Sequence, residues 1–80
     1  MKAIVNIALK NGVLDPQGKA VHHALSALKF NGVSDVRIGK QIVLQLEGDD
    51  EAKAKKDVET MCEELLANTV IEDYDIEIVK

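Results

Sequence analysis

The chain has 80 residues, of which fourteen are acidic and ten basic, and its net charge is −4. Nucleic-acid binding needs a basic stripe that neutralises phosphates, and the sequence has none, so we exclude that function. The apolar runs are too short to span a bilayer, and the N-terminus lacks a signal-peptide pattern. With one cysteine and no metal motif, residues 1–80 are expected to form a single cytoplasmic domain, which self-association would stabilise.

Two elements are predicted in the N-terminal part. Residues 2–9 alternate between apolar and mixed positions, which predicts a strand with one buried face. A helix is expected to begin at Asp15-Pro16, because Asp caps free N–H groups and proline suits the first helical position. The helix is expected to end at Asn31-Gly32. Its apolar stripe, suited to packing on a sheet, is Val21, Ala24, Leu25 and Leu28.

Gly18 stands two residues inside this helix. Glycine costs a helix about 1 kcal/mol relative to alanine, so local propensity does not favour it there. A side chain of one hydrogen atom does permit close approach. We therefore expect another backbone or a ligand to lie against Gly18.

The middle of the chain predicts two more strands. Val36 and Ile38 begin one, and residues 42–46 form the next, with apolar side chains at every second position. A two-residue turn at Gly39-Lys40 would place the polar residues of the later strand in the core. A three-residue loop, 39–41, or a bulge beside it, restores the apolar face and is our prediction.

The C-terminal part predicts a second helix and a last strand. Acidic residues 49–51 favour a helix start, because the N-terminal end of a helix dipole is positive. Asn68 is the predicted helix cap, and residues 74–79 alternate with Tyr74 on the buried face. The predicted buried stripe of the helix is Val58, Met61, Cys62, Leu65 and Leu66.

The fold predicted from this order is an α+β, two-layer β-α-β-β-α-β sandwich, with a four-stranded antiparallel sheet and both helices on one face. The opposite face mixes apolar and small polar residues, as subunit contacts do. We therefore predict a self-association face that contains Ile4, Asn6, Val43, Gln45 and Val79, with Arg37 on the same side of the sheet.

No catalytic or metal-binding set emerges from the sequence. His22 and His23 point about 100° apart on a helix, so they suit surface positions better than a shared metal ion. Cys62 lies in the apolar stripe and is expected to be an unreactive buried thiol. Arg37 has two readings of equal weight, a solvated edge residue or a contact to a carboxylate on a partner chain.

Three blocks of the sequence resemble the PurS family, the small subunit of phosphoribosylformylglycinamidine synthase. They are Gly-Val-Leu-Asp-Pro-Gln-Gly-Lys-Ala at 12–20, Asp-Val-Arg-Ile-Gly-Lys at 35–40, and Met-Cys-Glu-Glu-Leu-Leu-Ala-Asn-Thr-Val-Ile-Glu-Asp-Tyr at 61–74. Their order spans the chain. Two residues depart from the family, Lys29 where many members carry glycine and Thr69 where many carry proline.

The resemblance implies a non-catalytic subunit of an ATP- and glutamine-dependent ligase in purine biosynthesis. The complex uses ATP and magnesium, and this chain is expected to hold no cofactor. The implied partners are further copies of the chain, as a dimer or tetramer, and separate glutaminase and synthetase chains that it bridges, with a role in ammonia transfer. The polar residues of the matching blocks that we expect to meet those chains are Asp15, Gln17, Arg37, Lys40, Asn68, Glu72 and Tyr74.

Two other classes of function stay open at this stage. One is a regulatory domain that senses a metabolite at a dimer interface, which ligand-induced thermal shifts would reveal. The other is a stand-alone enzyme, which turnover by the purified chain would reveal.

Overall fold

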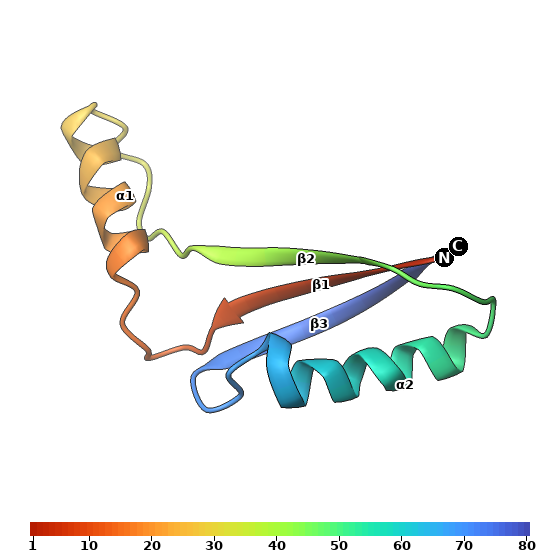
Figure 1. The fold of residues 1–80 in the computed structure, drawn as a ribbon. Helices are drawn as coiled ribbons and strands as arrows, with labels where there is room; N and C mark the ends of the chain where they lie inside the picture. Colours follow the sequence, from red (N-terminus) through yellow and green to blue (C-terminus); the bar gives the residue numbers. More distant parts are fainter.

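The computed structural model describes the whole chain, Met1–Lys80. Three antiparallel strands lie in the order β2-β1-β3, and one long helix covers one face of this sheet (Figure 1). The elements in chain order are β1 (Lys2–Leu9), α1 (Pro16–Ala27), β2 (Gly39–Gln45), α2 (Glu51–Met61), the π-helical turn η1 (Cys62–Leu66) and β3 (Glu72–Val79).

The core forms where the apolar faces of the strands meet α2. Val5 pairs with Ile42 of β2 and with Ile76 of β3, so the alternating residues of all three strands share one face. Val58 and Cys62 are fully buried against that face. The predicted faces of the first and last strands are confirmed, with Ala3, Val5, Ile7, Tyr74, Ile76 and Ile78 on the core side.

Helix α2 begins as its acidic residues predict. The Asp50 side chain accepts a hydrogen bond from the Lys53 N–H at 3.1 Å, and Glu51 lies in the first turn. The helix then widens into η1, where the Ala67 N–H donates to the Cys62 carbonyl across five residues. This wider turn rotates Leu65 out of the buried stripe, and its side chain is 82% exposed. The prediction that Leu65 is buried is wrong.

Helix α1 does not pack on the sheet of its own chain. It projects beyond one end of the strands, while both chain termini lie together at the opposite end (Figure 1). The radius of gyration is 16.0 Å, compared with about 12 Å for a compact chain of this length. The predicted two-helix layer is therefore wrong, because α2 alone covers the sheet. None of the helices has the length and apolar character that crossing a membrane requires.

The predicted fourth strand is absent from the sheet. Residues 33–38 lie beside the start of α1, and Gly39 and Lys40, expected in a hairpin loop, are the first residues of β2. The Ile38 N–H donates to the Asp15 carboxylate, so this main-chain group is not available for a strand ladder. The order is thus β-α-β-α-β with three strands, and Arg37 does not belong to the sheet face where the sequence pattern placed it.

The end of α1 shows what the departure at Lys29 does. The helix ends at Ala27, earlier than predicted, and the Lys29 N–H and Phe30 N–H donate to the carbonyls of Ser26 and Leu25. This pair of bonds closes a Schellman motif, which places Lys29 at a left-handed φ of 70°. Glycine adopts that conformation without steric cost, whereas lysine does not.

Asn68 likewise has a different role from the predicted one, since Ala67 follows the last helical residue. The Asn68 side chain accepts from the Val70 N–H at 3.2 Å, and its carbonyl accepts from the N–H groups of Ile71 and Glu72. Asn68 therefore shapes the turn that enters β3.

The difference between Ile7 and Leu65 can be tested by truncation. Ile7 is 2% exposed, so Ile7→Ala should lower the free energy of unfolding by about 2–5 kcal/mol. Leu65→Ala should change it by no more than about 0.5 kcal/mol, because the side chain lies outside the core. Urea titrations at one fixed chain concentration measure both values. Equal losses for the two variants would contradict the placement of η1.

Replacing Lys29 with glycine should stabilise the chain. The free energy of unfolding should rise by about 1 kcal/mol. Glycine relieves roughly 1–2 kcal/mol of left-handed backbone strain, but it costs roughly 0.5–1 kcal/mol because it loses more conformational entropy on folding. Lys19→Gly is the matched control, since Lys19 lies inside α1 and the same exchange should destabilise the helix. Thermal unfolding should move the two midpoints in opposite directions, and a lower midpoint for Lys29→Gly would refute the cap geometry.

Candidate functional site

The candidate site is the junction where the chain leaves β1 for α1 and returns to β2. Asp15 lies at its centre and is 4% exposed. One carboxylate oxygen accepts from the Gly18 N–H at 2.8 Å, and the other accepts from the Ile38 N–H at 2.7 Å. The first bond is the helix cap that the sequence predicts, with Pro16 at the first helical position. The second bond joins the start of α1 to the segment that returns to β2, and no sequence pattern predicted it.

The electrostatics of Asp15 follow from these bonds. Hydrogen bonds from the Ile38 and Gly18 N–H groups favour the ionised form, and together with the nearby Arg37 charge they lower the pKa of the carboxyl below its ordinary value, although burial opposes them. Asp15 is therefore a charged structural group at neutral pH.

Gly18 allows the two chain segments to touch. A Cβ atom at this position would lie 2.2 Å from the Val36 carbonyl oxygen, which is a main-chain atom with little freedom to move. The expected close approach of another backbone is confirmed. Any larger residue would force residues 33–38 away from α1.

Arg37 binds main-chain oxygens of its own chain. Its guanidinium donates to the carbonyls of Val13 at 3.0 Å, Lys10 at 3.1 Å and Leu9 at 3.4 Å. Neither reading of Arg37 from the sequence included this contact, because loop carbonyls leave no signature in a residue pattern. These bonds hold the β1–α1 connection against the segment that leads from α1 to β2.

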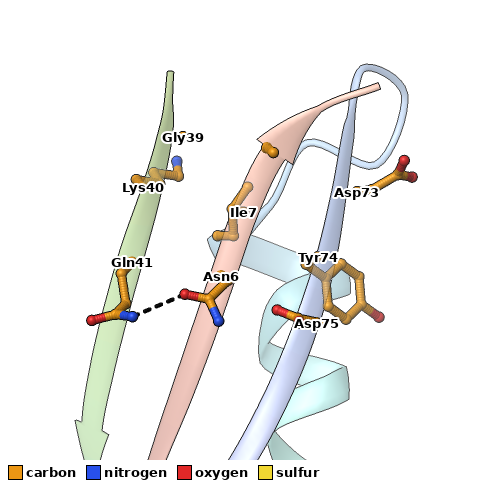
Figure 2. A pocket seen from close by; sticks show the side chains of 9 residues that line it. Asn6, Ile7, Gly39, Lys40, Gln41, Asp73, Tyr74 and Asp75 are labelled. Atoms are coloured by element: carbon orange, nitrogen blue, oxygen red, sulfur yellow. Dashed lines mark hydrogen bonds between the residues drawn. The ribbon is translucent and has the colours of Figure 1, made fainter. Parts of the chain in front are cut away.

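The structure gathers part of the residue set that the sequence assigned to partner chains. A hollow of about 210 Å³ is lined by Asp15, Gln17, Lys40 and Glu72, among others, where α1 begins and β2 starts. A shallower hollow of about 600 Å³ lies next to it, and Lys40 and Tyr74 contribute to its lining (Figure 2).

The second hollow runs across all three strands. Figure 2 shows Gln41, Asn6 and Asp75 side by side on β2, β1 and β3, and the Gln41 amide donates to the Asn6 side-chain oxygen at 3.0 Å. Nearby, the Lys10 ammonium lies 3.4 Å from the Asp73 carboxylate on the surface. This end of the sheet therefore presents polar side chains from β1, β2 and β3.

The remaining residues that the sequence assigned to partner contacts lie in the turn before β3 and on the core side of the sheet. The Asn68 N–H donates to the Glu72 carboxylate at 2.7 Å, so these two residues stabilise the turn before β3. Tyr74 is half-buried, and burial followed by the charge of Glu63 raises the pKa of its hydroxyl. Arg37 and Asn68 do not line the hollow that holds Gln17 and Lys40.

The predicted self-association residues share one face of the sheet. Ile4 pairs with Val43, and Lys2 pairs with both Gln45 and Val79, so the alternate positions Ile4, Asn6, Val43, Gln45 and Val79 point away from α2. Val43 is 49% exposed, which leaves an apolar side chain in the open.

The other chemically suggestive side chains have structural environments. His22 Nε2 lies 2.8 Å from the Val33 carbonyl oxygen; because a carbonyl only accepts, this nitrogen carries the proton. Cys62 is a buried free thiol, as predicted, and burial followed by the neighbouring Glu63 charge raises its pKa. A neutral, enclosed thiol is a poor nucleophile.

Known proteins closely resemble the chain in sequence. The sequence profile of the PurS family, described as phosphoribosylformylglycinamidine (FGAM) synthase, matches residues 2–80. The phosphoribosylformylglycinamidine synthase subunit PurS of Methanocaldococcus jannaschii is 49% identical over 79 residues, which cover 99% of this chain and 95% of that protein. The corresponding subunit of Bacillus subtilis is 53% identical over 81 aligned residues, with 96% and 90% covered.

Solved structures show the same arrangement of elements. The crystal structure of M. jannaschii PurS superposes with a TM-score of 0.89 at 48% identity, over 99% of this chain and 95% of that one. A chain of the PurLQS structure from Thermotoga maritima superposes with a TM-score of 0.86 at 34% identity, over 95% and 93% of the two chains.

The Asp15 bridge predicts a pH-dependent contribution to stability. Asp15→Asn should lower the free energy of unfolding at neutral pH, because an amide oxygen does not replace both carboxylate acceptors. Since the folded-state pKa lies below the ordinary 3.8, the advantage of the natural residue is complete above pH 3.8 and is lost as pH falls through the lower value. Urea titrations from pH 7 into the acid range, at fixed chain concentration, measure this difference.

Asp35→Asn is the control, because Asp35 is an exposed carboxylate on the returning segment. Its stability difference from the natural chain should stay small throughout the pH range. A gap between Asp15→Asn and the natural chain that does not narrow in acid would show that the carboxylate bridge is unimportant.

Proposed function

Because the chain belongs to the PurS family and is a subunit of phosphoribosylformylglycinamidine synthase in purine biosynthesis, we propose that it acts as a non-catalytic connector between the glutaminase and synthetase chains of that complex. The observation that carries the proposal is the uncovered apolar surface of α1. A helix that leaves its own sheet while keeping an apolar stripe is built for association.

The first contact we propose is with a second copy of the chain. Leu28 is 68% exposed and Val21 40% exposed on α1, although the stripe has the spacing of a sheet-packing helix. Helix α2 lies over β1 and β3, while Ile42 and Leu44 of β2 are only half-buried on the same face. An α1 helix from a second copy fits beside α2 above β2 and would bury both sets.

The same contact supplies a fourth strand. The main-chain groups of Asp35 and Arg37 make no backbone hydrogen bond within the chain, and β2 is an edge strand with one unpaired side. Adding residues 33–38 of one copy to β2 of another would satisfy both edges, as in other cases of strand addition. The strand that the sequence predicts would then form between copies.

The open sheet face gives a second contact of the same kind. We propose that Ile4, Val43 and Val79, with the amides of Asn6 and Gln45, pack against the same face of another copy. An interface of one type gives a dimer, and both types together give a tetramer.

For the larger chains we propose the end of the sheet near α1. Gln17 and Lys40 are exposed beside Glu72, and Tyr74 lines the neighbouring hollow with Lys40. Asp15, Arg37 and Asn68 would support this surface through their main-chain bonds. The PurLQS structure of T. maritima, whose chain resembles this one, supports a partnership with PurL- and PurQ-type proteins.

Chemistry is assigned to those larger chains. We propose that ATP, magnesium and glutamine bind there, and that this subunit holds the two active sites in register so that ammonia passes between them. The three groups with shifted pKa values here each have a structural environment: Asp15 caps α1, Cys62 is a buried thiol, and Tyr74 is a half-buried phenol on the core side of β3. The proposed location is the cytoplasm, which suits the free thiol of Cys62.

The proposal is tested by charging the α1 stripe. Leu28→Asp should abolish self-association, because burying an unpaired carboxylate in an apolar contact is strongly unfavourable. Ser26→Asp is the matched control, since position 26 lies on the opposite side of the helix and should keep the native mass. Native mass spectrometry of each variant, alone and co-expressed with the glutaminase and synthetase chains, with and without glutamine and ADP, gives the readout.

Loss of the oligomer and of the three-component complex in Leu28→Asp alone supports the connector. An unchanged mass for Leu28→Asp, or full glutamine-dependent synthesis by the two larger chains without this one, contradicts it.

A further inference from the structure

The segment between β1 and β2, which contains α1, leaves the sheet and returns to it at the same end. Ala8 at the end of β1 is paired with Gly39 at the start of β2, so the two connections start side by side. A Cβ at position 39 would lie 2.7 Å from the Ile7 carbonyl oxygen, so glycine allows this close crossing. The outgoing segment is also anchored by the Lys10 N–H, which donates to the Ile71 carbonyl at 2.8 Å.

Cross-links join the two connections along their length. Next to the sheet, Arg37 donates to the carbonyls of Leu9, Lys10 and Val13. Further out, Asp15 accepts from the Ile38 N–H, and the backbone at Gly18 touches the Val36 carbonyl. Beyond these, His22 donates to the Val33 carbonyl at 2.8 Å.

Two segments that are cross-linked at several positions along their length cannot rotate freely, as a single flexible linker can. Each cross-link involves a main-chain group, so bending the pair means breaking a hydrogen bond or moving a backbone. The linkers also carry little apolar packing of their own, since Leu14 and Ile38 are exposed. The polar cross-links are therefore what sets the direction of α1.

We propose that residues 9–18 and 33–39 form a rigid stalk that holds α1 away from its own sheet before a second chain binds. The functional role that we assign to the stalk depends on the self-association proposed above, whereas its rigidity does not. A chain whose helix could fold back onto its own sheet would cover the surface that a second copy needs. The stalk prevents α1 from folding back onto its own sheet. It also holds α1 in the orientation needed for binding, which reduces the entropy lost on association.

The stalk is tested by measuring the distance between α1 and α2 within one chain. Spin labels are placed at Ser26→Cys and Lys56→Cys, both exposed, in a Cys62→Ala background. Labelled chain is diluted into excess unlabelled chain, so that pulsed dipolar electron resonance reports distances inside single chains. Sedimentation of the same samples reports the oligomeric state. Thermal unfolding shows that each variant is folded under the conditions of the distance measurement.

The labelled chain should give one narrow distance. Gly18→Ala and Arg37→Ala should each broaden the distribution and move its maximum to shorter distances, because a Cβ at position 18 separates the two segments and loss of the guanidinium frees the carbonyls. Lys19→Ala is the control and should leave the distribution unchanged, since the Lys19 side chain makes no hydrogen bond or ion pair and alanine favours the helix.

A broad distribution in the natural stalk overturns the proposal, as does a narrow one that Gly18→Ala and Arg37→Ala leave unaltered. A chain that sediments as a monomer yet keeps the narrow distance, with both variants broadened, supports the stalk and removes the self-association. A chain that sediments as an oligomer but gives a broad distance distribution supports self-association and contradicts the stalk.

Discussion

The carboxylate of Asp15 sets the constraint on which the rest of this structure depends. It bridges the first turn of α1 and the Ile38 N–H, and it is almost fully enclosed while doing so. Because Ile38 is held there, residues 33–38 stay outside the sheet. Because that segment lies against Gly18, α1 stays at the end of the strands rather than over them. Together with the contacts of Arg37 and His22, this bridge leaves the apolar stripe of α1 exposed.

Local rules predict much of the fold. The alternation in β1 and β3, the Asp15-Pro16 helix start and the acidic start of α2 were all readable because neighbouring residues decide them. The close approach at Gly18 was also predictable, since glycine there contradicts helix propensity. The partner of that approach was not, because it comes from a segment eighteen residues further along the chain.

The failures share a physical cause, which is that a residue pattern does not say where an element packs. Val36 and Ile38 have the alternation of a strand, yet their main-chain atoms are engaged by the start of α1. Leu65 has helical spacing, but a single π turn changes its direction. In the candidate site, the sequence could nominate Arg37 but could not predict the loop carbonyls that it binds. The four-stranded pattern fits a sheet completed between copies as well as one completed within a chain, because residue alternation is the same in both.

In the role that we propose, this subunit contributes contact surfaces to its complex. Nine of its 80 residues are buried, so its own core is small, and much of its apolar surface is available to neighbours. The polar end of the sheet, near Gln17 and Lys40, lies at the root of α1. The proposed contacts of α1 with a second copy and of Gln17 and Lys40 with the larger chains therefore lie next to each other, so one association would influence the other.

Amide hydrogen exchange as a function of chain concentration tests the central claim most directly. The account predicts that residues 21–28, in α1 and its C-cap, exchange fast at low concentration and gain protection in step with the oligomer fraction, while β1 is protected by its own sheet throughout. Protection of α1 that is already complete in the dilute, monomeric chain would contradict it, since the apolar stripe would then be covered within a single copy.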